Sequence, residues 1–448
     1  MKKVTIAFMS MLMLAGTGLF AGSLDYLSNQ SVKWMMTTSK NASTDGADIV
    51  QYNPAGTAYL PKGLHIDLSG QTLLKYYSNK NVQVGSDSFG TLKQDYPTYI
   101  LPNLYLVNNF GEIGPGKLAA YLQTGIVAGG GELKYKDGTA GTTAMLSGLR
   151  ANASIGGAAI QSQEFIASSI YYGIGIGASY AFLDDMVSVS LGGRAVMAQR
   201  SFELDARYAN NVTLSGKYEY NATGFTPIIG VNVKPTKELT LAARFEAQTA
   251  LKFKYDEKRL NSSNNTFLLD NVIPALKAAG IEDGKKTRQD LPHVIGLGVN
   301  YELSDQLTLD LSGTLYLLSS ANLGYDDATE TGKVNKYFGT GWEVGLGATY
   351  KVLDELKVGL GALYTESGAK KSYLNNANTV LNASANPSLD SITIGLGATY
   401  DVLENLDVTL AFMWAHYFPE KFSFNGGAVS GKYAKDVYNI GYGVSYKL

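Results

Sequence analysis

The stretch 239-LTLAARFEAQTALKFKY-255 decides the fold class. Every second residue in it is apolar except Thr249, and the residues between them include the charged Arg244, Glu246 and Lys252. A period of two residues predicts a β-strand with one apolar and one polar face. At ~3.3 Å per residue, a strand of this length spans roughly 56 Å, which is more than an apolar membrane band of about 25 Å requires.

The same kind of strand recurs along the chain as part of a repeat. VIGLGVNYELSDQLTL begins at Val294, VGLGATYKVLDELKV at Val344 and TIGLGATYDVLENLDV at Thr393. Each copy has a strand, a short polar turn and a second strand, whereas long polar connections follow Tyr255 and Tyr364. Alternating short and long connections are typical of an all-β, antiparallel, transmembrane β-barrel. A water-soluble β-sandwich is the weaker alternative, because it rarely combines long strands with this asymmetry of loops.

We expect fourteen strands, an even number that places both ends of the chain on the periplasmic side. The expected strands are residues 64–77, 96–110, 117–135, 165–182, 186–208, 214–233, 239–255, 288–303, 307–319, 334–352, 356–366, 389–402, 406–424 and 429–448. The terminal GYGVSYKL resembles the signal that the barrel assembly machinery recognises, although Leu448 stands where an aromatic residue is usual. The lumenal charges, including Lys252, are expected to hydrate the inner face.

The bulk composition excludes several classes of protein. The 37 Lys and Arg residues nearly balance the 39 Asp and Glu residues, so no basic surface for nucleic acid is indicated. The one long apolar run lies at the start, where Lys2 and Lys3 precede an apolar stretch and a small residue at Ala21. This order predicts a secretory signal peptide over residues 1–21, with an uncleaved anchor helix as the alternative.

Residues 22–62 lack strand alternation and are expected to form a segment of their own. They are rich in Ser, Thr, Asn and Asp but also carry Trp34, Met35 and Met36, and apolar residues are rare in free tails. Burial inside the barrel as a plug is therefore favoured over a segment that hangs in the periplasm, and residues 63–448 are expected to form the barrel. The sequence YNPAG predicts a turn, because Asn precedes proline and glycine accepts positive φ.

With its signal peptide, a plug carrying NPAG and fourteen strands, the chain resembles the FadL/TodX family of outer-membrane transporters for long-chain fatty acids and other hydrophobic compounds. The resemblance implies passive uptake across the bacterial outer membrane, with the plug closing the lumen. It implies gate residues at Asn53, Pro54, Ala55 and Gly56. It also implies that the mature N-terminus reaches the ligand pocket, which here means Gly22, Ser23 and Leu24.

Three glycines interrupt the third expected strand, at Gly129, Gly130 and Gly131. Glycines inside a strand weaken pairing and mark a bulge or kink. In the family resembled, a kink in the third strand opens the barrel wall, so we expect a lateral opening beside these residues. A strand end that runs into a loop is the equal alternative.

The loop after Tyr255 contains TFLLDNVIPALKAAG, whose apolar residues have helical spacing. Apolar side chains on an outer loop cover or capture something apolar. The resemblance favours ligand capture, and a helix that only caps the mouth is equally compatible. The candidate ligand-binding residues in this helix are Phe267, Leu268, Val272 and Leu276.

The sequence shows no motif typical of an enzyme or of a metal site. The three histidines lie on expected strands without a nucleophile motif, and without cysteine there is no thiolate site, so we expect neither an enzyme nor a metal or other cofactor. The expected partners are outer-membrane lipid, a hydrophobic ligand such as a fatty acid and the assembly machinery, with the chain a monomer. A general diffusion porin for small polar solutes is the alternative function.

Overall fold

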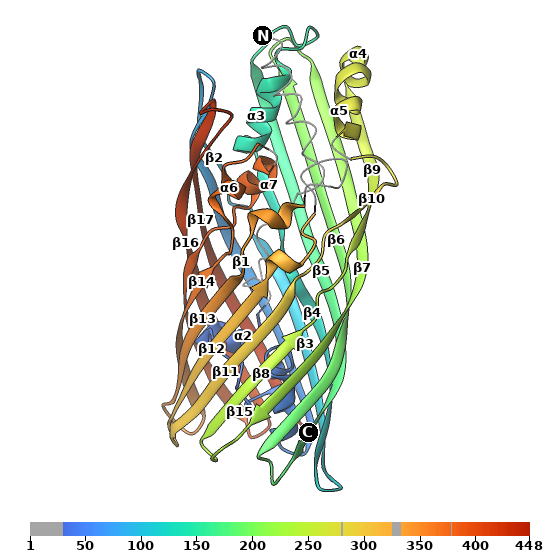
Figure 1. The fold of residues 1–448 in the computed structure, drawn as a ribbon. Helices are drawn as coiled ribbons and strands as arrows, with labels where there is room; N and C mark the ends of the chain where they lie inside the picture. Colours follow the sequence, from blue (N-terminus) through green and yellow to red (C-terminus); the bar gives the residue numbers. More distant parts are fainter. Residues whose placement is uncertain (1–29, 279–280, 325–332, 378) are drawn as a thin grey trace.

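The strands of the computed structural model close into one antiparallel barrel (Figure 1). The structure describes residues 30–278, 281–324, 333–377 and 379–448. Seventeen strand segments form fourteen barrel strands, because three of the barrel strands, over residues 87–113, 239–262 and 286–304, are each divided into two segments. The barrel closes where the last strand pairs with the first, from Lys447–His65 to Val429–Val84. The predicted fold class and strand number are confirmed.

The strands agree closely with the predicted ones over residues 116–135, 187–233 and 356–447. They are β1 (Gly63–Val84), β2 (Asp87–Gln94), β3 (Thr98–Ile113), β4 (Gly116–Tyr135), β5 (Ile160–Phe182), β6 (Val187–Tyr208), β7 (Thr213–Val233), β8 (Leu239–Glu246), β9 (Lys252–Ser262), β10 (Lys286–Arg288), β11 (His293–Ser304), β12 (Leu307–Leu317), β13 (Gly341–Lys351), β14 (Leu356–Glu366), β15 (Ser391–Leu403), β16 (Leu406–Phe424) and β17 (Val429–Lys447).

The stretch 239–255 is not one continuous strand, which corrects the prediction. Its partner β7 contains Pro227, which has no N–H to donate, and the pairing with β8 ends at Ile228–Glu246. Regular pairing resumes only at Asn221–Lys254. The irregular residues between β8 and β9 exchange the two faces, so that Phe253 is buried inside and Lys252 is exposed outside. Lys252 is therefore not a lumenal charge.

Three further boundaries differ from the prediction. The region after Tyr77 was expected to be a loop, but β1 continues to Val84 and turns into β2 through Gly85, whose φ is +63°. The strand expected from Val334 begins only at Gly341, and Val334–Tyr337 form the 3-10 helix η6. The eighth strand is interrupted between β10 and β11.

The two ends of the barrel differ, as outer-membrane barrels do. Most connections at the lower end in Figure 1 are tight turns, such as Gly114-Pro115 between β3 and β4. The outer end carries the helices of the long connections: α3 (Ala140–Leu149), α4 (Asn265–Phe267), the π-helical turn η4 (Leu268–Val272), α5 (Ile273–Ala278), the 3-10 helix η5 (Leu318–Ser320), η6, α6 (Lys371–Leu374) and α7 (Val380–Ala385). Among the described residues, no helix is both long and apolar enough to cross a bilayer.

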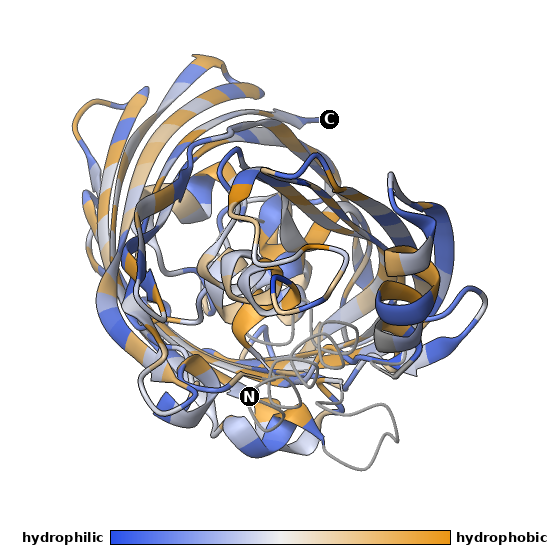
Figure 2. Cartoon of the chain, turned by 90° about the horizontal axis from the view of Figure 1, so that it is seen from above, coloured by the Kyte–Doolittle hydropathy of each residue, from blue (hydrophilic) through white to orange (hydrophobic). Residues whose placement is uncertain are grey.

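Residues 30–62, here called the lumenal segment, lie among the barrel strands, where Figure 1 labels α2, and Figure 2 shows that chain segments occupy the inside of the ring. They form α2 (Val32–Thr37), η2 (Ala47–Gln51) and η3 (Pro54–Tyr59). Every residue of α2 is buried, and the Ser31 side chain accepts a hydrogen bond from the Trp34 N–H at its N-terminus. α2 lies against β13–β17, whereas η3 lies against β4–β7.

The glycines of the sequence repeat make room for α2. A Cβ atom at Gly345 would lie 2.5 Å from the carbonyl oxygen of Thr38, and one at Gly361 would meet the carbonyl oxygen of Thr37 still more closely. A side chain there would occupy the space that α2 takes. The residues of this glycine bed are Gly345, Gly347, Gly359, Gly361, Gly395, Gly441 and Gly443.

Candidate functional site

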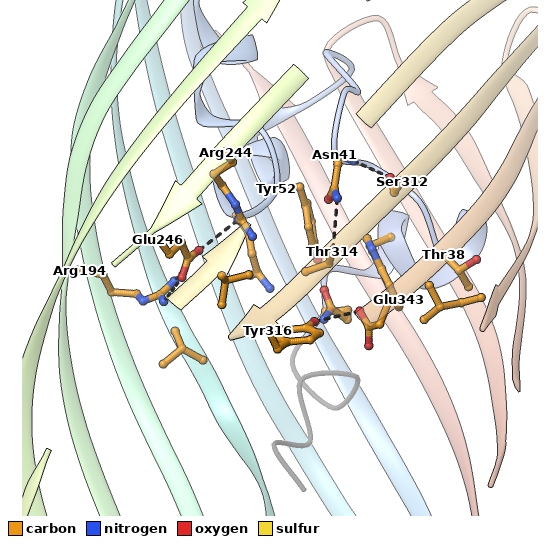
Figure 3. A pocket seen from close by; sticks show the side chains of 16 residues that line it. Thr38, Asn41, Tyr52, Arg194, Arg244, Glu246, Ser312, Thr314, Tyr316 and Glu343 are labelled. Atoms are coloured by element: carbon orange, nitrogen blue, oxygen red, sulfur yellow. Dashed lines mark hydrogen bonds and ion pairs between the residues drawn. The ribbon is translucent and has the colours of Figure 1, made fainter. Parts of the chain in front are cut away.

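A cavity of about 80 Å³ lies in the lumen beside the lumenal segment (Figure 3). From the segment, Trp34 and Tyr52 line it, with their rings stacked at 6.4 Å between centroids. The barrel wall contributes residues from β4, β6, β8, β11, β12, β13 and β14. These are Val127, Arg194, Arg244, Glu246, Val294, Ser312, Thr314, Tyr316, Glu343 and Leu363.

Three of the charged groups in this cavity form ion pairs, and the fourth, Glu343, is hydrogen-bonded to hydroxyl groups. Arg194 Nη2 lies 2.6 Å from Glu246 Oε2, and Arg244 Nη1 lies 3.2 Å from Glu246 Oε1. Across the cavity, the Tyr316 hydroxyl donates to Glu343 Oε2 over 2.9 Å. Two guanidinium groups and two carboxyl groups therefore line one small volume. Strand alternation predicts that Arg244 and Glu246 point inward, but the sequence cannot place Arg194 and Glu343 beside them.

Buried ion pairs hold the lumenal segment to the barrel. Lys33 Nζ lies 3.3 Å from Asp407 Oδ1 and 3.7 Å from Asp67 Oδ2, and it also donates to Ser445 Oγ over 2.8 Å. Burial alone would lower the pKa of Lys33, but the attraction of Asp67 and Asp407 outweighs it, so the pKa lies above its usual range. These bonds fasten α2 to β1, β16 and β17, beside a polar cavity of about 270 Å³.

The expected gate residues lie on the opposite wall from α2. Asn53 precedes the helix η3 and its side chain donates to the Ser43 carbonyl over 3.1 Å. The Ala55 carbonyl accepts from Ser188 Oγ over 2.8 Å, and Pro54 begins η3. Gly56 lies within η3 and does not take the positive φ expected of it. A Cβ there would lie 2.7 Å from the Asn53 side chain and 3.1 Å from the Ser43 carbonyl, so a larger residue would press on this turn. Gln51 and Tyr52, which directly precede Asn53 in the sequence, line the lumenal cavity.

The backbone pairing of the barrel wall is interrupted near the glycines of β4. Pairing of β3 with β4 runs from Ile113–Gly116 to Asn103–Gly125 and ends there. Beyond that point the pairing of β4 with β5 shifts register on both sides of Ala128. Gly129 (φ +86°) and Gly131 (φ +79°) have left-handed backbones that favour glycine. We call this edge, residues 126–132 of β4 facing Thr98 and β2, the seam.

The lumenal cavity reaches the seam. Val127 lies in the first register shift of β4 and also lines the cavity. A bulge changes the direction of a side chain relative to regular strand alternation. The wall of the lumenal cavity therefore lies next to the place where the backbone pairing of β4 is interrupted.

A second cavity, of about 60 Å³ and apolar, lies at the outer end. Its lining comes from α3, β5, β6, β7, β9, η4, α5 and α7, and includes Val272 and Leu276 of the expected helix. Phe267 is fully buried and Leu268 partly buried against the same apolar core. Sequence periodicity identified the loop residues, but it did not predict α3, whose Met145 faces them across the cavity.

The signal peptide, Gly22, Ser23 and Leu24 lie outside the described residues. Each histidine has a local bond: His65 to the Pro61 carbonyl, His293 to the Gln248 N–H and His416 to Asp436. In the part of the chain that the structure describes, no group of three or more His, Asp or Glu side chains is arranged to hold a metal ion.

The comparison with protein families decides the identity of the fold. The sequence model described as "Outer membrane protein transport protein (OMPP1/FadL/TodX)" matches residues 21–448. The chain belongs to this family. It is accordingly a transport protein of the bacterial outer membrane.

Solved structures of the family have the same fold at low sequence identity. A FadL homologue of Pseudomonas aeruginosa is 15% identical with a TM-score of 0.66, and the match covers 95% of this chain and 99% of that chain. The toluene transporter TodX of Pseudomonas putida is 12% identical with a TM-score of 0.60, covering 95% and 99%. The toluene transporter TbuX of Ralstonia pickettii is 14% identical with a TM-score of 0.58, again covering 95% and 99%. Among curated protein sequences none matches.

Proposed function

We propose that the protein is a channel for passive uptake of long-chain fatty acids or other hydrophobic small molecules. The ligand is captured at the apolar outer cavity, passes the lumenal cavity under control of the lumenal segment, and leaves sideways through the seam into the membrane.

The observation that carries this proposal is the meeting of the lumenal cavity and the seam at Val127. A hydrophobic molecule gains by moving directly into lipid instead of crossing the aqueous periplasm. A sideways exit is also supported by the position of α2, because this helix and its buried ion pairs obstruct the inner end of the lumen.

The sizes of the cavities favour a gated path. The two cavities measure about 60 and 80 Å³. An apolar cavity of about 150 Å³ holds benzene, so side chains and loops must move for a ligand to pass. The lumenal segment forms part of one cavity through Trp34 and Tyr52, so its movement would widen the path.

The class of ligand rests on the relatives and on the cavity lining. Two of the similar structures are toluene transporters, which supports a hydrophobic cargo. The lumenal cavity is lined by two arginines and two glutamates, so its formal charge does not select an anion. Competition between a labelled fatty acid and toluene for uptake distinguishes an amphiphile channel from an aromatic one.

A reversible clamp tests the lateral route. The chain has no cysteine. A Cβ at position 131 would lie 3.4 Å from the Thr98 Cβ, close to the ~3.5–4.5 Å of disulfides. In the Thr98→Cys/Gly131→Cys variant, oxidation should abolish most uptake in cells and reduction should restore it.

The reduced double variant is the matched control, because any strain from cysteine at the positive φ of position 131 is present in both states. Equal uptake in the oxidised and reduced forms, with the disulfide verified by mass spectrometry, would exclude release through the seam.

A further inference from the structure

Lys75 is a buried lysine whose side chain bridges the seam. It lies in β1, faces the lumen and is 1% exposed. The strand formed by β2 and β3 separates β1 from β4. The Lys75 ammonium reaches across it to β4, where it donates to the carbonyl oxygens of Gly130 at 2.8 Å and Glu132 at 2.6 Å.

Thr98 connects the same groups from the other side of the seam. Its hydroxyl accepts a hydrogen bond from Lys75 Nζ over 2.8 Å and donates one to the Gly130 carbonyl over 2.9 Å. The Lys75 backbone carbonyl accepts from Gln94 Nε2 of β2 over 2.9 Å. Three strands therefore meet at one ammonium group, beside the stretch where the pairing of β3 with β4 has ended.

The need for such a group follows from the membrane. Backbone carbonyls within a bilayer must have a donor, and in a barrel wall the next strand normally supplies it. At the seam, the carbonyls of Gly130 and Glu132 receive that donor from a side chain. A lysine ammonium is a point charge on a flexible stem, so it can leave its acceptors without unpairing a whole strand.

We propose that Lys75 is a latch that holds the seam closed, and that its release sets the rate of lateral passage. Lys75 is a positioning residue in this role, since it acts through the backbone of β4. The proposal rests on the proposed lateral release, but its first test is independent of any ligand.

That test is amide hydrogen exchange of the purified full-length barrel in lipid nanodiscs. In Lys75→Met, amides of residues 126–132 should exchange about tenfold faster or more, because hydrogen bonds from a charged donor are stronger than neutral ones. Lys75→Arg, which keeps the donors, should stay near the wild type, and β13 and β14 should not change in either variant. Unchanged exchange at residues 126–132 in Lys75→Met would overturn the latch.

Thr98→Val supplies a second variant if Lys75→Met does not fold, which is checked by heat-dependent mobility on gels. It removes the hydroxyl that accepts from Lys75 and donates to Gly130, so the same residues should exchange faster, by a smaller factor. Exchange at the wild-type rate in this variant would equally contradict the latch.

The second readout is uptake in cells. Lys75→Met should raise the maximal rate per folded barrel and leave the half-saturating concentration unchanged, because capture occurs at the outer cavity. Lys75→Arg should restore the wild-type rate. Faster exchange with an unchanged maximal rate would refute the claim that the latch sets the rate.

If the oxidised cysteine clamp leaves uptake intact, the proposed lateral route is wrong. Hydrogen exchange alone then decides whether Lys75 holds the seam closed.

Discussion

Gly361 and Gly313 lie on neighbouring parts of the barrel wall and have opposite surroundings. A Cβ at Gly361 would collide with the Thr37 carbonyl of α2, whereas a Cβ at Gly313 would have only an ordinary contact at 3.9 Å with the Glu343 carbonyl. The repeated Gly-Leu-Gly pattern was visible in the sequence as part of a strand. That it forms a bed for residues 32–37 was not, because the partner lies some three hundred residues away.

Replacing Gly361 by alanine should unseat α2 without disrupting the barrel. The added methyl group forces either the wall or the helix to move, at a cost of about 1–3 kcal/mol, and the helix has fewer bonds to lose. We expect higher ion conductance in planar bilayers than for the wild type. Gly313→Ala is the control and should conduct like the wild type. Equal conductance for both variants would mean that the bed does not position α2.

At the scale of single elements, the strand pattern was predictable where lipid and lumen impose opposite preferences. Leu241 is exposed on the outside of the barrel, and Arg244 lines the lumenal cavity, as this rule predicts. It fails in β9, where Phe253 and Tyr255 face inward, because that strand packs with the outer loop helices. One proline in the neighbouring strand permits the exchange of faces. The effect of this proline depends on the strand that pairs with it, and strand pairing cannot be read from a single sequence.

The loop formed by α4, η4 and α5 carries a prediction about capture. Leu276 lines the outer cavity, whereas Leu269 on the same loop is 60% exposed. Leu276→Gln places an amide in an apolar cavity at a cost of about 1–3 kcal/mol. The half-saturating ligand concentration should rise roughly tenfold at an unchanged maximal rate, measured by uptake of a labelled ligand.

Leu269→Gln is the matched control and should leave both parameters as in the wild type. A lower maximal rate for Leu276→Gln, with the half-saturating concentration unchanged, would place this loop after capture instead of at it.

At the scale of the whole molecule, the lumen is filled from both ends. The lumenal segment enters from the periplasmic side, and the loop 367–390 folds inward from the outer side. Asn79 Nδ2 donates to the Ser384 carbonyl over 2.9 Å, and the Tyr135 hydroxyl donates to the Ala385 carbonyl over 2.7 Å. Sequence composition favoured burial of the first segment. It did not predict the second, because the polar residues of that loop are those of a surface loop.

This filling distinguishes the proposed channel from the alternative of a general diffusion porin. In planar bilayers, the wild-type barrel should show no large steady conductance, and deletion of residues 22–60 should produce one. The deletion keeps the closing bonds between Leu64 and Leu448, so the barrel can still form. A large, stable conductance of the intact chain would favour the porin.

The glycine bed also fixes an order of events during biogenesis. The residues that α2 rests on belong to β13, β14, β15 and β17, so α2, which precedes every strand in the sequence, can take its place only after the last strands have formed. Until then, Trp34, Met35 and Met36 have no apolar surface of the barrel to cover them. The lumenal segment therefore stays undocked until the barrel closes. Its docking is a late step of assembly that depends on a completed barrel.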